Sequence, residues 1–298
     1  MIEAPSTVPA AGARLPRGQR LRRGLAENPL MVAGGVMSVL ILLVALLAPL
    51  LAPFPADAGS ATHPFMVLRA PSAQHWFGTD NVGRDVYSRV LYGARISPLI
   101  ALVVLVLACA IGVPLGIAAG FFGGWVDEAI MRVTDIFLAF PSLLLALALA
   151  EVLPPSLITL TIAIAVTWWP WYTRLIRGQA ASVAGRPYVE SCRALGISRT
   201  WIIFRHILPN SITPLIVQVS LDVGGVILTV SALSFLGLGA QDPTPDWGLM
   251  VAEGQNYFMT GWWVVTFPGL AILVTAFAFT LLGDGLRDLL DPKRIFLR

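Results

Sequence analysis

Residues 188–210 read YVESCRALGISRTWIIFRHILPN and form a polar interruption between two long apolar runs of the chain. Only 12% of the 298 residues are charged and 56% are hydrophobic, so a segment with four charged side chains and a histidine stands out. These side chains are Glu190, Arg193, Arg199, Arg205 and His206. The helix-capping residues of the segment indicate which secondary structure it forms.

The first half of the segment predicts a short helix. Pro187 suits the first helical position, where a backbone N–H is not needed. The helix is expected to run to about Leu195, with Glu190 and Arg193 as a pair three residues apart on one face. Gly196 then lies where a left-handed residue commonly ends a helix.

The second half predicts another short helix. Ser198 is expected to cap its N-terminus, with Ile197 packing on Ile202, and Pro209 is expected to end it. The two helices would form a compact, partly apolar knob (residues 187–209). Such a knob could fit a groove on another protein, and an amphipathic helix lying on a membrane surface is an equally good interpretation from local physics.

The rest of the chain is that of a membrane protein. Its mean hydropathy is +0.77, and 12% of its residues are charged. Soluble domains usually have about 25% charged residues. Apolar runs long enough to cross a hydrocarbon core of about 30 Å recur along the chain. Because these runs lack period-two alternation, they predict helices and not a membrane barrel. Six spans are predicted, at about 30–52, 96–120, 131–152, 156–173, 212–236 and 262–283.

The predicted fold class is therefore an all-α polytopic membrane protein with six transmembrane helices. The first apolar run is too long for the core of a cleaved signal peptide, about 7–15 residues, so it is expected to be a retained anchor. The chain is predicted to divide into a disordered tail (1–28), a first span with an external loop (29–95), a transmembrane core (96–285) and a C-terminal tail (286–298).

The positions of the cations predict the orientation. Lys and Arg gather in the N-terminal tail, in residues 174–205 and in the C-terminal tail, whereas residues 237–261 contain none. The positive-inside rule then makes both termini and residues 174–210 cytoplasmic, with 53–95 and 237–261 external. The net charge of +3 thus reflects topology, and no nucleic-acid partner is expected.

Several enzyme classes are excluded by residue types. The only lysine is Lys293, so the chain cannot build a phosphate-binding loop with its lysine and is not expected to hydrolyse ATP. His63, His75 and His206 lack metal-ligand spacing, and no metal or cofactor is predicted. A solvated or capping role is expected for His63 and His75. The two cysteines show no paired pattern and are expected to be structural.

Two acids fall inside predicted spans. Asp135 and Asp222 are expected either to line a pathway or to be hydrogen-bonded structural groups, because an unpaired acid at mid-bilayer costs roughly 2.5–3.5 kcal/mol. Gly112, Gly116 and Gly120 share one helix face and predict close packing of two helices, within the bundle rather than between subunits.

The knob resembles the EAA loop of ABC importer permeases. That pattern runs Glu-Ala-Ala, three residues, Gly, nine residues, then Ile-x-Leu-Pro, and here Glu190, Gly196, Leu208 and Pro209 match it. Ser191 and Cys192 replace the two alanines, and His206 stands in place of the isoleucine. The resemblance implies that these seven residues couple the chain to an ATPase.

Four further motifs are similar to those of the C-type permease subunits of dipeptide and oligopeptide importers. They are FGTDNVGRDVYSRVLYGARIS (77–97), GFFGGWVDEAIMR (120–132), LSFLGLGAQDPTPDWG (233–248) and LLGDGLRDLLDPK (281–293). The resemblance, over about residues 76–294, implies a type I importer permease of the MetI-like fold in a bacterial inner membrane. It implies four kinds of partner: a second homologous permease subunit, two cytoplasmic ATPase subunits, an external substrate-binding protein and the lipid bilayer.

Alternatives exist both for the substrate and for the class of protein. Within the same type of importer, the substrate could be nickel, glutathione or another small solute instead of a peptide. A secondary carrier is disfavoured because no inverted repeat or mid-membrane ion site is evident. An intramembrane hydrolase is disfavoured because no histidine lies in a predicted span.

Overall fold

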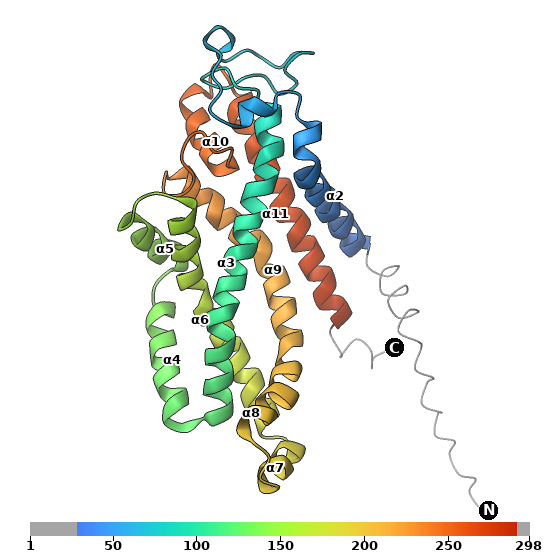
Figure 1. The fold of residues 1–298 in the computed structure, drawn as a ribbon, viewed down its shortest axis with the longest axis vertical. Coiled ribbons are helices and arrows are strands. Elements are labelled where there is room, and N and C mark those ends of the chain that lie inside the picture. Colours follow the sequence, from blue (N-terminus) through green and yellow to red (C-terminus); the bar gives the residue numbers. More distant parts are fainter. Residues whose placement is uncertain (1–28, 291–298) are drawn as a thin grey trace, which may run out of the picture.

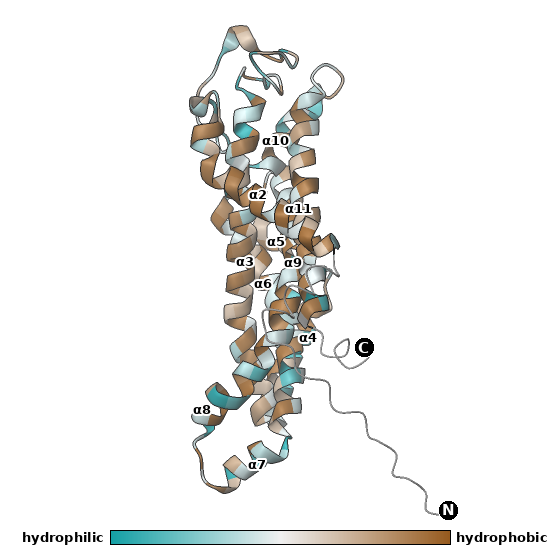
Figure 2. Ribbon diagram, turned by 90° about the vertical axis from the view of Figure 1, so that its right-hand side faces the viewer, coloured by the Kyte–Doolittle hydropathy of each residue, from teal (hydrophilic) through white to brown (hydrophobic). Residues whose placement is uncertain are grey.

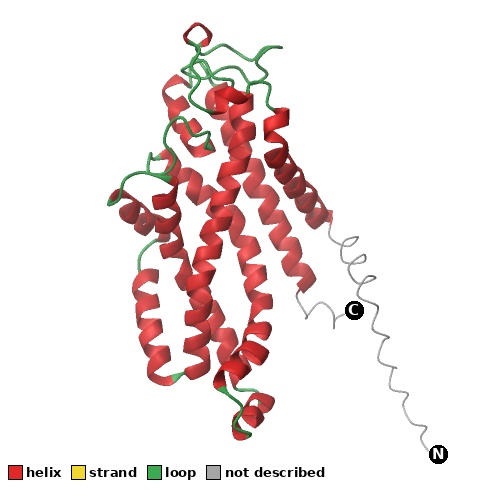
Figure 3. Ribbon diagram, in the orientation of Figure 1, coloured by secondary structure: helices red, strands yellow, loops and turns green. Residues whose placement is uncertain are grey.

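The computed structural model describes residues 29–290 of the chain. The predicted tail at 1–28 and the last residues of the predicted segment 286–298 lie outside this range. Within it the chain is helical and contains no strand (Figure 3), only a single bridge between Thr79 and Asp85. The longer helices are α2 (Pro29–Leu51), α3 (Val86–Phe122), α4 (Gly124–Leu138), α5 (Ser142–Glu151), α6 (Leu157–Ala184), α9 (Leu208–Phe235) and α11 (Trp263–Leu290).

Shorter elements lie at the two ends of the bundle. Residues 52–85, with the 3₁₀ turns η1 (Pro55–Ala58) and η2 (Pro64–Met66), lie beside α10 (Trp247–Gly254) at one end. Helices α7 (Pro187–Ala194) and α8 (Arg199–Ile202) lie at the opposite end (Figure 1). We call these the cap end and the knob end.

Apolar composition supports a membrane-spanning bundle. Four helices in the described residues are long and apolar enough to cross a membrane: Pro29–Leu51, Val86–Phe122, Arg199–Phe235 and Trp263–Leu289. A fifth span results if α4 and α5 are counted together. Figure 2 shows the apolar residues along the middle of these long helices. The predicted span at 156–173 corresponds to the N-cap and first part of α6, which packs along α3 in the bundle. The total of six spans stays a prediction.

The predicted span at 131–152 is divided into two helices. Helix α4 ends at Leu138, α5 begins at Ser142, and the two are bent by 84°. Pro141 lies at the break in an extended conformation. Proline offers no N–H to a helix and disfavours helical geometry in the residue before it, which accounts for the break.

Glycines let α3 and α6 approach closely. A Cβ atom built at Gly112 or at Gly116 would lie 2.7 Å from a backbone oxygen of α6, Trp169 or Thr173 respectively. One turn further along α3, a Cβ atom built at Gly120 would likewise lie too close to the backbone oxygen of Arg177 in α6. The prediction that the glycine repeat packs within the bundle is confirmed.

The cap end is fixed to the bundle by hydrogen bonds from tryptophans. The indole of Trp263 in α11 donates to the carbonyl of Thr79 at 3.0 Å. The indole of Trp247 in α10 donates to the carbonyl of Val90 in α3, also at 3.0 Å. Residues 52–85 and α10 therefore share one end of the bundle, as the predicted topology requires, while the side of the membrane stays a prediction.

Candidate functional site

The first helix of the knob begins and ends as its residues predict. Pro187 occupies the first turn of α7, and Gly196 is left-handed with φ of +73°. The N–H of Ile197 donates to the carbonyl of Cys192 at 3.1 Å, and that of Gly196 donates to Arg193 at 3.0 Å. This pair of bonds is a Schellman motif, which satisfies carbonyls that the end of the helix would leave unpaired.

The second helix is capped as predicted but continues past its predicted end. The Ser198 hydroxyl accepts from the backbone N–H of Trp201 at 3.3 Å. Helix α8 then passes into a π-helical turn, η3 (Ile203–Ile207), which leads directly into α9. The wider π turn offsets the hydrogen-bond ladder just before Pro209, so the proline, in the first turn of α9, does not end the helix.

The inner face of the knob is packed against the bundle. Val189, Ile202 and Ile207 are fully buried, in a cluster with apolar residues of α3 and α6 that includes Ile117 and Ile176. Leu208 packs against the same cluster. The knob is therefore packed tightly against the long helices, so a displacement of the knob would also displace those helices.

Two arginines add to this anchorage. The guanidinium of Arg193 lies over the Phe121 ring at 4.9 Å, and that of Arg199 lies over Phe122 at 5.9 Å. The predicted pair between Glu190 and Arg193 is absent from the ion pairs of the described residues. Arg193 turns to the aromatic ring, which leaves Glu190 exposed on the surface of the knob.

The outer face of the knob exposes large apolar side chains. Leu195, beside the glycine turn, is 79% exposed, and Phe204 is 66% exposed. Trp201 and Tyr188 are exposed to a lesser degree. An anchored helix pair with an apolar tip is suited to insertion into a groove of another protein.

Two of the three departures from the EAA pattern, Cys192 and His206, contact each other. The thiol of Cys192 lies 3.8 Å from Nε2 of His206, and the rings of Tyr188 and Trp201 flank His206 with centroids 5.4 and 5.1 Å away. The Ser191 hydroxyl donates to the carbonyl of Pro187 at 3.0 Å. The substituted positions thus form internal contacts of the knob, which their separation in the sequence does not reveal.

The two predicted intramembrane acids have different environments and are not brought together. Asp135 in α4 forms an ion pair with Arg174 of α6, and both side chains are at least half exposed. Asp222 in α9 accepts hydrogen bonds from Tyr172 of α6 at 2.8 Å and from Gln218 at 3.0 Å. Asp135 thus carries its own counter-charge, whereas the partners of Asp222 are neutral.

A buried ion network at the cap end was missed by the sequence reasoning. The side chains of Arg84 and Arg89 are 3% and 1% exposed. Arg84 donates to Asp80 at 2.7 Å and to Asp242 at 2.6 Å, and Arg89 lies 3.5 Å from Glu253 of α10. Burial raises the pKa of Glu253 above its ordinary value, and the two arginines oppose that shift. The network ties the start of α3 to α10.

The histidines of the cap end are also part of its folded structure. His75, expected to be solvated or capping, is buried, and its Nδ1 lies 2.9 Å from the carboxylate of Asp85. Asp85 is itself the N-cap of α3, because it accepts from the N–H of Ser88 at 2.8 Å. His63 pairs with Asp57 at 2.9 Å. No group of three metal-ligating side chains occurs in the part of the chain that the structure describes.

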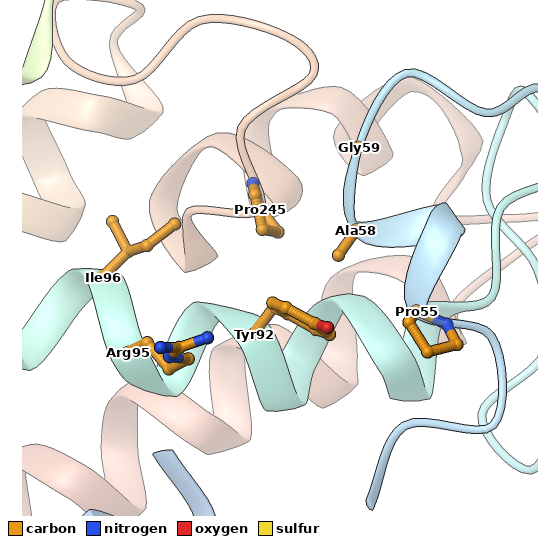
Figure 4. Close-up of a pocket in the computed structure, with 7 residues that line it drawn as sticks. All are labelled: Pro55, Ala58, Gly59, Tyr92, Arg95, Ile96 and Pro245. Carbon is orange, nitrogen blue, oxygen red and sulfur yellow. The ribbon is translucent and has the colours of Figure 1, made fainter. Parts of the chain in front are cut away.

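A hollow of about 400 Å³ lies near the network. Figure 4 shows Tyr92 and Arg95 of α3 on one side of it, Ala58 of η1 and the following Gly59 on another, and Pro245 from the loop before α10. Most of its lining is apolar, and the residues predicted for function lie elsewhere.

Comparisons with known proteins agree with these features. The family model described as "Binding-protein-dependent transport system inner membrane component" matches residues 112–296, and that described as "N-terminal TM domain of oligopeptide transport permease C" matches residues 17–71. The "Probable D,D-dipeptide transport system permease protein DdpC" of Escherichia coli strain K12 is 50% identical over 276 residues, which is 93% of this chain and 92% of that protein.

Other relatives carry related names. The "Dipeptide transport system permease protein DppC" of Alkalihalophilus pseudofirmus is 43% identical, covering 90% of this chain and 88% of that protein. The "Glutathione transport system permease protein GsiD" of Pectobacterium atrosepticum is 40% identical, covering 94% of this chain and 92% of that protein. Among solved structures, an inward-facing MetNI methionine ABC transporter chain matches with a TM-score of 0.53 at 16% identity, covering 67% of this chain and 96% of that one. This last likeness concerns the fold.

Proposed function

The chain belongs to the family of binding-protein-dependent transport system inner membrane components, and from this premise we propose that it is the permease subunit of an ATP-driven importer for dipeptides and short oligopeptides. It is a multi-pass helical membrane protein of the MetI-like fold.

The peptide substrate rests on one observation. Half of the residues are identical, over 93% of the chain, to a relative named for D,D-dipeptides. Two further relatives are named for dipeptide and for glutathione. Glutathione is itself a short peptide with a free amino group and free carboxylates. A short peptide is therefore the substrate class that these names share.

The knob supports coupling to an ATPase on another chain. Its buried face is anchored on α3 and α6, and its exposed face carries Leu195 and Phe204. Closure of two ATPase subunits would move a docked knob, and its anchorage would pass that movement to the long helices. Glu190, Ser191, Cys192, Gly196, His206, Leu208 and Pro209 are proposed to shape this contact.

The remaining partners follow from the same family. A second homologous permease subunit would complete the pathway, and an external binding protein would deliver substrate to the cap end. In this proposal the knob end and both termini lie in the cytoplasm of a bacterial cell, and the cap end lies outside its inner membrane.

Reconstitution tests the proposal. The chain is placed in proteoliposomes with its partner subunits, and uptake of labelled dialanine and ATP hydrolysis are measured together. We expect ATP-dependent uptake that requires the binding protein, and no hydrolysis by the purified chain alone. Glutathione and a nickel chelate serve as competing substrates. ATP turnover by the pure chain, or uptake without ATP, would contradict the proposal.

A further inference from the structure

Asp222 lies at the middle of a helix that can span the membrane. It is 14 residues from Leu208 and 13 from Phe235, the ends of α9, which is about 20 Å in each direction at 1.5 Å per residue. The Tyr172 hydroxyl donates to one carboxylate oxygen at 2.8 Å, and the Gln218 amide donates to the other at 3.0 Å. The side chain is thus held in a fixed position by α6 and by its own helix.

The charge of Asp222 has no counter-ion within the described residues. Its two partners are neutral, and no arginine or histidine of residues 29–290 forms an ion pair with it. The acids of α4 differ, because Asp135 is paired with Arg174 and Asp127 with Arg177. A lone acid at mid-membrane is costly, so such a group is a candidate for binding a charged ligand.

The surroundings of Asp222 suit a cation. Asp222 is partly exposed, and Gly225, one turn further along α9, is exposed as well. The ring of Trp168 lies 3.7 Å from the position that a Cβ atom at Gly225 would take. Trp168 is one turn before Tyr172 in α6, so a carboxylate and an aromatic ring border the same stretch of α9. Both groups attract cations.

We infer that Asp222, together with Trp168 at the neighbouring Gly225, forms a recognition site for the protonated amino group of the transported peptide. This inference rests on the proposed function, because it assigns the cation to a peptide substrate. An ammonium group needs only one carboxylate and neighbouring acceptors, whereas a metal ion needs several ligands, and the described residues offer no such group. The carboxylate would be neutralised when substrate is present.

Direct binding to the permease complex tests this site without selection by the external binding protein. Saturation-transfer NMR is recorded with dialanine and with N-acetyl-dialanine, which lacks the charged amine. For the unmodified complex we expect dialanine to bind about tenfold more tightly, which corresponds to about 1.4 kcal/mol. Asp222→Asn should remove this preference, and Asp222→Glu should keep most of it. Asp284→Asn, an exposed acid near the end of α11, is the matched control and should keep all of it.

Three results would overturn the inference: equal binding of the two peptides by the unmodified complex, an unchanged preference in Asp222→Asn, or loss of the second permease subunit from the Asp222→Asn complex. The last would show that a cation of the partner subunit neutralises Asp222. Peptide uptake is measured in parallel. The complex could show an amine preference that depends on Asp222 and yet import no peptide. That result would rule out peptide as the transported substrate, but it would still support a cation-binding site at Asp222.

Discussion

Arg89→Met is expected to destabilise the cap end by about 3–5 kcal/mol, the usual effect of removing one partner from a buried ion pair. The Arg89 side chain is 1% exposed and lies 3.7 Å from Asp80 and 3.5 Å from Glu253. Without it, the carboxylates of Asp80, Asp242 and Glu253 share the single charge of Arg84. The thermal midpoint in detergent should fall, and proteolysis of residues 53–85 should become faster. Arg95→Met, at an exposed position of the same helix, should change stability by less than about 0.5 kcal/mol.

A double variant distinguishes the network from a general effect of losing a large side chain. Arg89→Met together with Glu253→Gln removes one charge of each sign, so it should be less destabilised than the sum of the two single variants. Groups that do not interact usually give effects that add to within about 0.5 kcal/mol. Additive effects here would show that the two side chains are not coupled.

Gly196→Val is expected to abolish most ATP-driven uptake while the protein still inserts and assembles. The left-handed φ of +73° costs a residue with a Cβ atom about 1–2 kcal/mol, and a β-branched side chain should fare worse. A Cβ atom there would meet no other atom within 4 Å, so the strain acts on the turn and not on the packing. The relative positions of α7 and α8 should change, and with them the fit of the knob to the ATPase. Substrate-stimulated hydrolysis and uptake are measured together with membrane levels.

Three further variants distinguish strain at the Gly196 turn from the effects of adding or removing a side chain elsewhere. Gly196→Asn should keep more uptake, because asparagine tolerates the left-handed region better than valine. Gly178→Val adds the same side chain at an exposed helical glycine of α6 that is also free of close contacts, and it should transport normally. Glu190→Ala should show a mild loss, because one polar group is removed and the turn is kept. Near-normal uptake by Gly196→Val at normal membrane levels would show that the knob does not couple transport to hydrolysis.

Local features of the fold were predictable from the sequence. Capping residues identified both short helices of the knob, because Gly196 and Ser198 act on their immediate neighbours. The apolar runs identified the long helices, since length and apolarity are local properties. Proline was harder to interpret. Pro141 breaks a helix, whereas Pro209 follows a π turn and is accommodated, and the π turn has no signal in the sequence.

Contacts between distant residues were not predictable in the same way. Arg84 and Arg89 fall in residues 53–95, which the sequence predicts to be external, and no local pattern indicates that they are buried beside Asp242 and Glu253. These partners are more than 150 positions away in the chain, for example 158 between Arg84 and Asp242. The contact between Cys192 and His206 was missed for a related reason: it depends on how α7 and the π turn fold against each other. Asp222 was identified as an acid inside a span, but only its neutral partners show that its charge is left without a counter-ion.

Photo-crosslinking from the two ends of the bundle tests the central claim, that the knob is the part of the chain that contacts an ATPase. Benzoylphenylalanine replaces either Leu195 of the knob or Met259 of the cap end, which are 79% and 93% exposed. After irradiation of the assembled complex in membranes, position 195 should crosslink to the ATPase subunit, and position 259 should not. Crosslinking of the ATPase subunit from position 259, with none from position 195, would contradict the account.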